Sequence, residues 1–177
     1  MGLNPQVIGK EMNHGYAGSY ARQPDMIVNT RPAGAPAGTD TQIPFGTPVE
    51  YDANGNVVPM GTGSTAAKFV GVAAREIKTS LNYLTQAAGG YAKGEPVPVF
   101  QRGAISVKCN VGTPKLGGDV YVRVTANSAV PTGIVGGFEA VADATAANTV
   151  KLTNCQWAGP ADANGIAELR ILTMNNA

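Results

Sequence analysis

Every regular pattern in this sequence is short, because glycine and proline interrupt the chain at close intervals. The 177 residues include 23 Gly and 12 Pro. Between these breaks, apolar and polar residues alternate with a period of two, which is typical of a strand with one buried face. The clearest alternations have their apolar positions at Ile105, Val107 and Cys109, at Val120, Val122 and Val124, and at Ala167, Leu169 and Ile171. The sequence therefore predicts an all-β fold, either a compact β-sandwich or a small β-barrel.

Charged side chains are scarce, at 14% of the chain against about 25% in typical soluble domains. Such a surface indicates that a partner covers part of it. The net charge is +1 and the cations are scattered singly, which argues against direct nucleic-acid binding. The N-terminus has no charged region followed by an apolar stretch, and the longest apolar run, 69–74, is too short for a membrane span. We expect a soluble product that is made in a cytoplasm.

Residues 1–42 differ from the rest of the chain, because Gly and Pro are dense there and neither period is sustained. One interpretation is a disordered tail, but a solvated tail seldom carries aromatic and large aliphatic residues. We therefore predict a long extended N-terminal arm that becomes ordered against a neighbouring subunit. Its candidate partner contacts are Tyr16, Tyr20, Arg22, Met26, Ile27 and Arg31.

Residues 43–177 are predicted to form a β-rich body, within which two segments share one order of features. The segments are 46–73 and 117–138, and each has a Gly-x-[Pro/Asp]-Val start, a turn, a Val-Pro pair and an aliphatic-Val-Gly run. This order predicts an internal repeat of one β unit. The alternative is chance similarity in a chain rich in Gly and Val.

The tetrapeptide Asp-Ala-Asn-Gly occurs twice, at 52–55 and 162–165, each time between strand-like runs. Asn-Gly favours a hairpin with a type I′ turn, in which both central residues have positive φ. The alternative is the start of a calcium loop, which would need a bidentate Glu at its twelfth position. Gly63 and Thr173 stand there, so hairpin turns are the preferred interpretation.

No set of residues marks a catalytic site or a cofactor site. His14 is the only histidine, which removes most arrangements of a His-based triad or metal site. The stretch 61–66 fits the dinucleotide fingerprint but lacks a helix and a distant acidic residue, so we interpret it as a loop. Trp157 is interpreted as core or interface, with a sugar-stacking platform as the alternative. Cys109 and Cys155 are expected to be reduced and to face inward.

Taken together, these stretches resemble the structural cement family, the head decoration proteins of tailed bacteriophages. The resemblance covers nearly the whole chain in order, although no single motif is a chemical signature. The matching stretches are Gly15-Tyr-Ala-Gly, Ala21-Arg-Gln-Pro-Asp25, Ile43-Pro-Phe-Gly-Thr-Pro-Val49, Ala67-Lys-Phe-Val-Gly-Val-Ala-Ala-Arg75, Tyr91-Ala-Lys-Gly-Glu-Pro-Val97, Val107-Lys-Cys-Asn-Val-Gly112, Leu152-Thr-Asn-Cys-Gln-Trp157 and Ala161-Asp-Ala-Asn-Gly165.

The resemblance implies a structural virion component without enzymatic activity or cofactors. Such a subunit would be synthesised in the bacterial host cytoplasm and would bind the outer face of the capsid, bridging subunits of the major capsid protein. Related decoration proteins commonly sit as trimers, so a homotrimer is also implied.

Two rival functions remain open at this stage. The first is a β-rich receptor- or carbohydrate-binding domain of a phage or bacterium, which would expose Trp157 beside other aromatic residues. The second is a hydrolase with an unmarked pair of carboxylates, which would place two acidic residues in one enclosed pocket.

Overall fold

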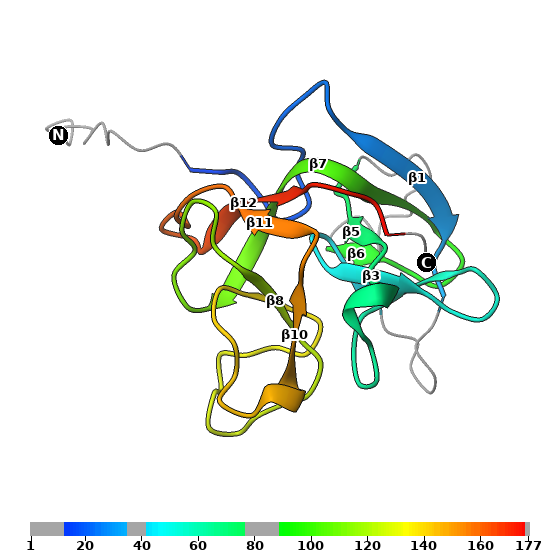
Figure 1. The fold of residues 1–177 in the computed structure, drawn as a ribbon. Coiled ribbons are helices and arrows are strands. Elements are labelled where there is room, and N and C mark those ends of the chain that lie inside the picture. Colours follow the sequence, from blue (N-terminus) through cyan, green and yellow to red (C-terminus); the bar gives the residue numbers. More distant parts are fainter. Residues whose placement is uncertain (1–12, 35–41, 77–88, 176–177) are drawn as a thin grey trace, which may run out of the picture.

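The computed structural model describes residues 13–34, 42–76 and 89–175, and the regular secondary structure of these ranges is almost entirely β (Figure 1). Within them, two single-turn 3-10 helices occur, η1 (Ala66–Lys68) and η2 (Ala146–Asn148), and no helix is long and apolar enough to cross a membrane. The strands are β1 (Ile27–Pro32), β2 (Ile43–Pro44), β3 (Pro48–Tyr51), β4 (Val57–Pro59), β5 (Gly71–Ala73), β6 (Gly90–Tyr91), β7 (Pro96–Val111), β8 (Val120–Arg123), β9 (Phe138–Glu139), β10 (Thr149–Leu152), β11 (Cys155–Trp157) and β12 (Ile166–Ile171).

The fold is organised around β7, a strand of 16 residues that pairs with four other strands. In its first half, Phe100 pairs with Val28 of β1 on one edge and with Val72 of β5 on the other. In its second half, β7 pairs antiparallel with β12 and parallel with β9. As a result, β7 crosses the middle of the molecule (Figure 1). The main sheet continues from β7 through β9 to β8 and β10 and through β5 to β3, while β1 lies on the edge of β7 opposite β5.

The main sheet runs in the order β10-β8-β9-β7-β5-β3-β4, with β1, β12 and β11 joined beside this path. β2 and β6 form a separate two-stranded sheet. The expected all-β class is confirmed, but the small barrel is wrong, because closure requires the first and last strands of a sheet to pair. Among the described strands, β10 pairs only with β8, so the sheet stays open.

A bulge interrupts the alternation of β7 at its centre. Ile27 of β1 lies opposite Arg102 while Val28 lies opposite Phe100, so the pairing skips one residue of β7. Gly103 follows with a φ of +110°. A bulge of this kind reverses which face the following side chains occupy. Phe100 and Ile105 therefore enter the same apolar cluster, although an odd number of positions separates them.

Buried side chains form two apolar clusters that share β7. Val97 and Val99 belong to the smaller cluster, while Phe100 and the residues after the bulge belong to the larger one. The smaller cluster draws only on residues 33–99, whereas the larger one joins residues from Met60 to Ile171, so segments distant in sequence bury each other there. The larger cluster contains Met60, Phe69, Val72, Ala74, Phe100, Ile105, Val107, Val120, Val122, Phe138, Leu152, Cys155, Trp157, Ala167, Leu169 and Ile171.

Residues 13–34 are joined to the body and do not form a separate arm. The Gly18 N–H donates to the Ser106 carbonyl (2.7 Å) and the Ala21 N–H donates to the Ala104 carbonyl (3.0 Å), both on β7. β1 then continues along the first half of β7. The long arm predicted for 1–42 is thus not confirmed in its described part, and residues 1–12 and 35–41 lie outside the described residues. The segment lacks a strand-like pattern because most of β1 is exposed at the edge of the sheet, where alternation is not required.

The two segments of the predicted repeat lie on opposite sides of β7. In each segment the first strand pairs antiparallel with the last, β3 with β5 and β8 with β9, and the last strand lies beside β7. The segments also differ, because β5 is antiparallel to β7 whereas β9 is parallel to it. The internal repeat stays a prediction.

Both Asp-Ala-Asn-Gly segments form turns, but not of type I′. Gly55 and Gly165 have φ near +75°, while no described residue other than glycine has positive φ. The aspartates stabilise these turns, since Asp52 Oδ1 accepts the Asn54 and Asn56 N–H groups at 2.8 and 2.9 Å. Asp162 accepts the N–H groups at positions 164 and 166 in the same way. The predicted turns are confirmed and their predicted type is wrong, because the Asp side chain holds Asn in the ordinary region of φ.

Candidate partner-binding surface

The six predicted contact residues divide into two groups in the structure. Three are exposed: Tyr16, Arg22 and Arg31. Three are half-buried: Tyr20, Met26 and Ile27. The exposed group offers more side-chain surface to a partner. The half-buried group instead attaches the N-terminal segment to β7.

Tyr20 is the main anchor of that segment. Its ring lies 5.6 Å from the ring of Phe100, and its hydroxyl donates a hydrogen bond to the Glu76 carboxylate. Burial raises the pKa of Tyr20, and the hydrogen bond to Glu76 raises this pKa further. Tyr20 is thus a half-buried structural donor, and its role as a partner contact stays a prediction.

Tyr16 and Arg31 form exposed contacts with other parts of the body. The guanidinium of Arg75 lies 4.5 Å from the centre of the Tyr16 ring, and that of Arg31 lies 5.9 Å from the centre of the Tyr51 ring. Tyr16 is 69% exposed, so one face of its ring stays available. Each exposed cation–π contact contributes about 0.5–1 kcal/mol of interaction free energy. These contacts therefore orient the two rings without burying them.

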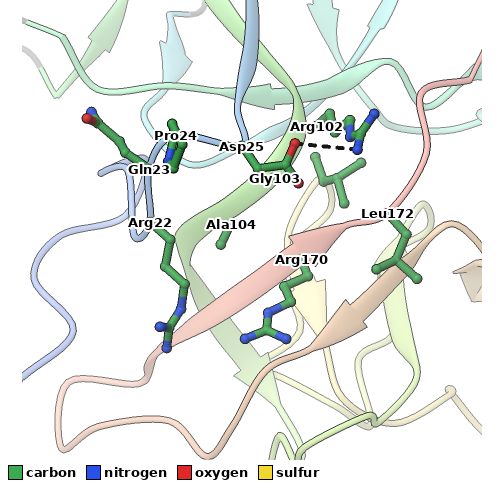
Figure 2. A pocket seen from close by; sticks show the side chains of 10 residues that line it. Arg22, Gln23, Pro24, Asp25, Arg102, Gly103, Ala104, Arg170 and Leu172 are labelled. Carbon is green, nitrogen blue, oxygen red and sulfur yellow. Dashed lines mark ion pairs between the residues drawn. The ribbon is translucent and has the colours of Figure 1, made fainter.

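Arg22 borders a cleft of about 500 Å³ that the turn at 22–25 forms with β7 and the end of β12. The cleft is lined by three arginines and one carboxylate (Figure 2). At one end Arg22 Nε donates to Glu168 Oε1 at 2.7 Å, and at the other end Arg102 pairs with Asp25 at 3.4 Å. The hydrogen bond from Arg22 lowers the pKa of the Glu168 carboxyl, which burial alone would raise. Glu168 is therefore a charged anchor beneath the cleft.

A second cleft, of about 570 Å³, is largely apolar and lies between the β3–β4 region and the loop before β9. Ile134 and Val135 stand at this groove with 57% and 41% of their surfaces exposed. Ala17, the residue after the exposed Tyr16, also lines it. Exposed apolar patches of this kind mark interaction surfaces on soluble proteins.

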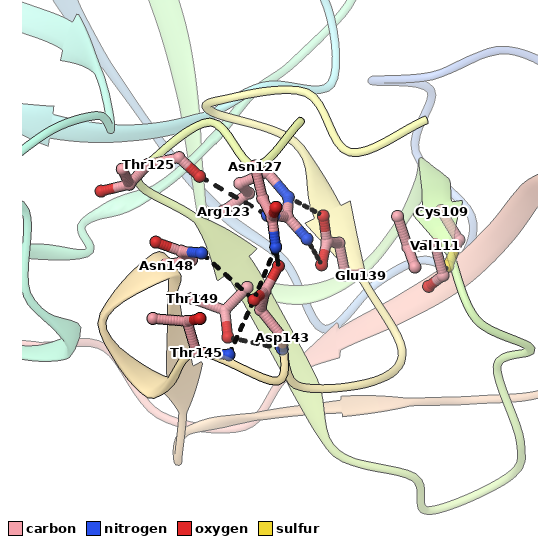
Figure 3. Close-up of polar contacts among 10 residues, drawn as sticks. All are labelled: Cys109, Val111, Arg123, Thr125, Asn127, Glu139, Asp143, Thr145, Asn148 and Thr149. Atoms are coloured by element: carbon pink, nitrogen blue, oxygen red, sulfur yellow. Dashed lines mark hydrogen bonds and ion pairs between the residues drawn. The ribbon is translucent and has the colours of Figure 1, made fainter. Parts of the chain in front are cut away.

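A buried network of charged side chains joins β8, β9 and the loop before β10 (Figure 3). Arg123 of β8 is 1% exposed and forms a two-pronged ion pair with Glu139 of β9, at 2.5 and 3.0 Å. Its Nη1 also donates to Asp143 at 2.7 Å. The amides of Asn127 and Asn148 donate to Asp143 as well, and these bonds lower the pKa of the Asp143 carboxyl. Every acceptor faces a donor, so the network is structural and offers no reactive group.

Trp157 and the two cysteines are placed inside the body. Trp157 is 1% exposed, with its ring 6.5 Å from that of Phe138. Its position is therefore core, and the predicted alternative of a sugar-stacking platform is wrong, because stacking needs an open ring face. Cys155 is buried and Cys109 is half-buried against the larger cluster, and both are free thiols, as expected.

In the part of the chain that the structure describes, no group of three His, Cys, Asp or Glu side chains could hold a metal ion. His14 is exposed, and its backbone N–H donates to Asp162 Oδ2 at 2.9 Å. The arginine-lined cleft contains a single carboxylate among its lining residues, Asp25, and the apolar groove contains none. These two clefts do not hold the paired carboxylates that a glycoside hydrolase needs.

Sequence reasoning missed Arg170, Ile134 and Val135 as members of these surfaces. Arg170 stands in a strand whose alternation is clear, so its outward position was predictable but its proximity to Arg22 was not. In the predicted repeat, Ile134 and Val135 belong to an aliphatic-Val-Gly run that corresponds to the run at 69–71 in the first segment, and such a run is expected to form a buried strand. Only the fold reveals that they stand outside the core.

Comparison with known proteins agrees with this architecture. The family model described as structural cement protein (E217 gp24/Pam3 gp6) matches residues 4–172. No curated protein matches the chain. A chain from the solved capsid of Myoviridae phage XM1 is similar in fold, with a TM-score of 0.65, 16% identity and 99% of each chain covered. The match over nearly the whole length shows that this chain belongs to the phage structural cement protein family.

Proposed function

We propose that this protein binds the outer face of the shell formed by the major capsid protein and stabilises that shell without catalysing a reaction. The observation that carries the proposal is the family match over residues 4–172, which includes the N-terminal segment and the body alike. The protein would be synthesised in the cytoplasm of the bacterial host and would then become part of the virion.

The surface supports this function because it combines few charges with apolar side chains that the fold leaves exposed. Ile134 and Val135 stand at the apolar groove, and Tyr16 is exposed next to Ala17, which lines it. A stable contact buries roughly 1,000 Å² or more, which one small groove does not supply. Contacts to several shell subunits at once would add avidity, so no single contact has to be tight.

The test is co-sedimentation with expanded and unexpanded shells of the major capsid protein that lack the cement protein. We expect binding to the expanded shells and a higher temperature of shell disruption after binding. A variant with Ile134→Ser and Val135→Ser should bind about tenfold more weakly, because a few apolar anchors carry most of the affinity of an interface. Ser128→Thr and Thr132→Ser provide a control with the same number of changes on exposed residues near this loop. Absence of binding to either form of the shell would contradict the proposal.

A receptor- or carbohydrate-binding function has less support. Its requirement was an exposed aromatic cluster around Trp157, and Trp157 is buried. Tyr16 is exposed but is occupied on one side by Arg75.

A further inference from the structure

We propose that the arginine-lined cleft at the 22–25 turn binds a carboxylate side chain of a partner protein through the guanidinium groups of Arg22 and Arg170. This inference rests on the proposed function, because it assigns one of the surfaces through which the protein would contact the capsid shell. The partner is defined by its chemistry: a protein segment that presents one or two Asp or Glu side chains.

Glu168 positions the two arginines from below. Its side chain is 9% exposed, and its Oε1 accepts from Arg22 Nε at 2.7 Å and lies 3.4 Å from Arg170 Nε. Because one carboxylate oxygen engages both Nε atoms, the two guanidinium groups lie side by side at one end of the cleft (Figure 2). A buried charge that fixes two exposed side chains is a preorganised arrangement, which reduces the entropy lost on binding.

The outer edges of both guanidinium groups remain open. Arg22 and Arg170 keep 64% and 46% of their side-chain surfaces exposed. Among the described residues, no acceptor bonds to the Nη atoms of either side chain. Two parallel N–H donors on one guanidinium match the two oxygens of a carboxylate, and such bidentate pairs are among the strongest hydrogen bonds in proteins.

The base of the cleft is rigid, because the turn at 22–25 packs directly on β7. An added Cβ at Gly103 would lie only 2.1 Å from the carbonyl oxygen of Asp25. Gly103 and Ala104 of β7 and Ile171 of β12 also line the cleft. A partner group would therefore enter a site of about 500 Å³ that already exists in the free protein.

The charge balance favours a protein carboxylate over a nucleic acid. Arg22, Arg102 and Arg170 contribute three positive charges, and Asp25 and Glu168 contribute two negative ones, which leaves one net positive charge. One carboxylate neutralises this excess. A nucleic acid presents a row of phosphates, so its further charges would face Asp25 and Glu168 without a stripe of cations to receive them.

The first experiment measures binding to the expanded shells for the variant with Arg22→Gln and Arg170→Gln. We expect about tenfold weaker binding at low salt and a flatter dependence on salt than for the natural protein. The matched control is Lys68→Gln with Lys93→Gln, which removes the same charge from exposed residues that do not line the cleft. The control should bind within about twofold of the natural protein, since exposed charges far from the contact contribute little. Equal binding by both double variants overturns the inference.

The second experiment needs neither a variant nor a shell. Pentaglutamate is added to the natural protein, and the Nε–Hε signals of its arginines are followed by NMR. We expect the Arg22 and Arg170 signals to shift with pentaglutamate and the shifts to disappear in about 1 M salt. Absence of these shifts overturns the inference, and larger shifts with a short DNA duplex would replace it with a nucleic-acid site. Shifts in a protein that fails to bind shells would instead contradict the proposed function and leave the carboxylate site in place.

Discussion

Gly103 directly follows the bulge of β7 and has a φ of +110°, a backbone conformation that strains any residue other than glycine. A Cβ at this position would also lie 2.1 Å from the Asp25 carbonyl oxygen, which belongs to the turn beneath the arginine-lined cleft. One residue thus satisfies two requirements: the change of face within β7 and the close approach of the N-terminal segment.

We predict that Gly103→Ala lowers the free energy of unfolding by more than about 3 kcal/mol, because a backbone shift is added to the usual cost of roughly 1–2 kcal/mol for this region of φ. Gly94→Ala is the matched control, since Gly94 has a φ of +82° and open space where a Cβ would be. It should cost only about 1–2 kcal/mol. Urea denaturation measures both values. Equal losses would show that the contact with Asp25 does not constrain the fold.

The two thiols should resist alkylation in the folded protein. Burial raises the pKa of Cys155, and burial is also the main cause of the raised pKa of Cys109, whose Sγ lies 3.3 Å from the Val111 carbonyl. Since the thiolate is the reactive form, we expect little reaction with iodoacetamide at pH 8 and addition at both cysteines in denaturant. Mass spectrometry without a reductant distinguishes the outcomes. Unmodified cysteines in the denatured protein would indicate a disulfide instead.

At the scale of elements, the Arg123 network joins β8, β9 and the loop before β10. Removing one partner from such a network leaves other buried charges unpaired, which is more harmful than losing an exposed ion pair. The network also makes the stability of this region depend on pH, through Asp143.

Asp143 should make the protein sensitive to acid. Its pKa is lowered in the folded state, so its contribution to stability is complete above the ordinary Asp pKa of about 3.9 and is lost as the pH falls below that value. Asp143→Asn should be less stable at pH 7 and should show a flatter loss of stability between about pH 5 and pH 2. Asp119→Asn serves as a control, because Asp119 is 54% exposed. Thermal unfolding across this range tests the prediction, and parallel curves for Asp143→Asn and the natural protein would contradict it.

The described part of the N-terminal segment should be indispensable for folding, because it packs on the body and does not extend as a separate arm. Tyr20, Met26 and Val28 pack against the larger cluster. Each such side chain stabilises the fold by up to about 1.5–3 kcal/mol, while a whole domain is stable by only about 5–15 kcal/mol.

We therefore expect that removal of residues 1–34 abolishes the cooperative unfolding transition measured by circular dichroism. Removal of residues 1–12 keeps every contact that the structure describes, and this shorter deletion should keep the transition. A cooperative transition after the longer deletion would mean that the body folds alone.

At the scale of the whole molecule, the scarcity of charge bears on assembly. We predict a homotrimer whose contacts depend on apolar side chains and not on ion pairs. Exposed ion pairs contribute about 0–1 kcal/mol each and weaken with salt, whereas apolar burial does not. Light scattering at low salt and in about 1 M salt should therefore give the same trimer mass. A monomer under both conditions would contradict the trimer, and dissociation on adding salt would contradict the apolar contact.

Local sequence patterns were enough to predict the all-β class, the positions of several strands and turns, and the surface poor in charge. These features arise from interactions between near neighbours: a period of two places apolar residues on one face of a strand, and Asp-Ala-Asn-Gly stabilises its own turn. The tertiary structure decided which distant segments meet. It brought Arg22 to Arg170, paired Ile27–Pro32 with β7, and left Ile134 outside the core. Pairing across such distances depends on how much apolar surface the whole chain can bury together, and no local pattern encodes that sum.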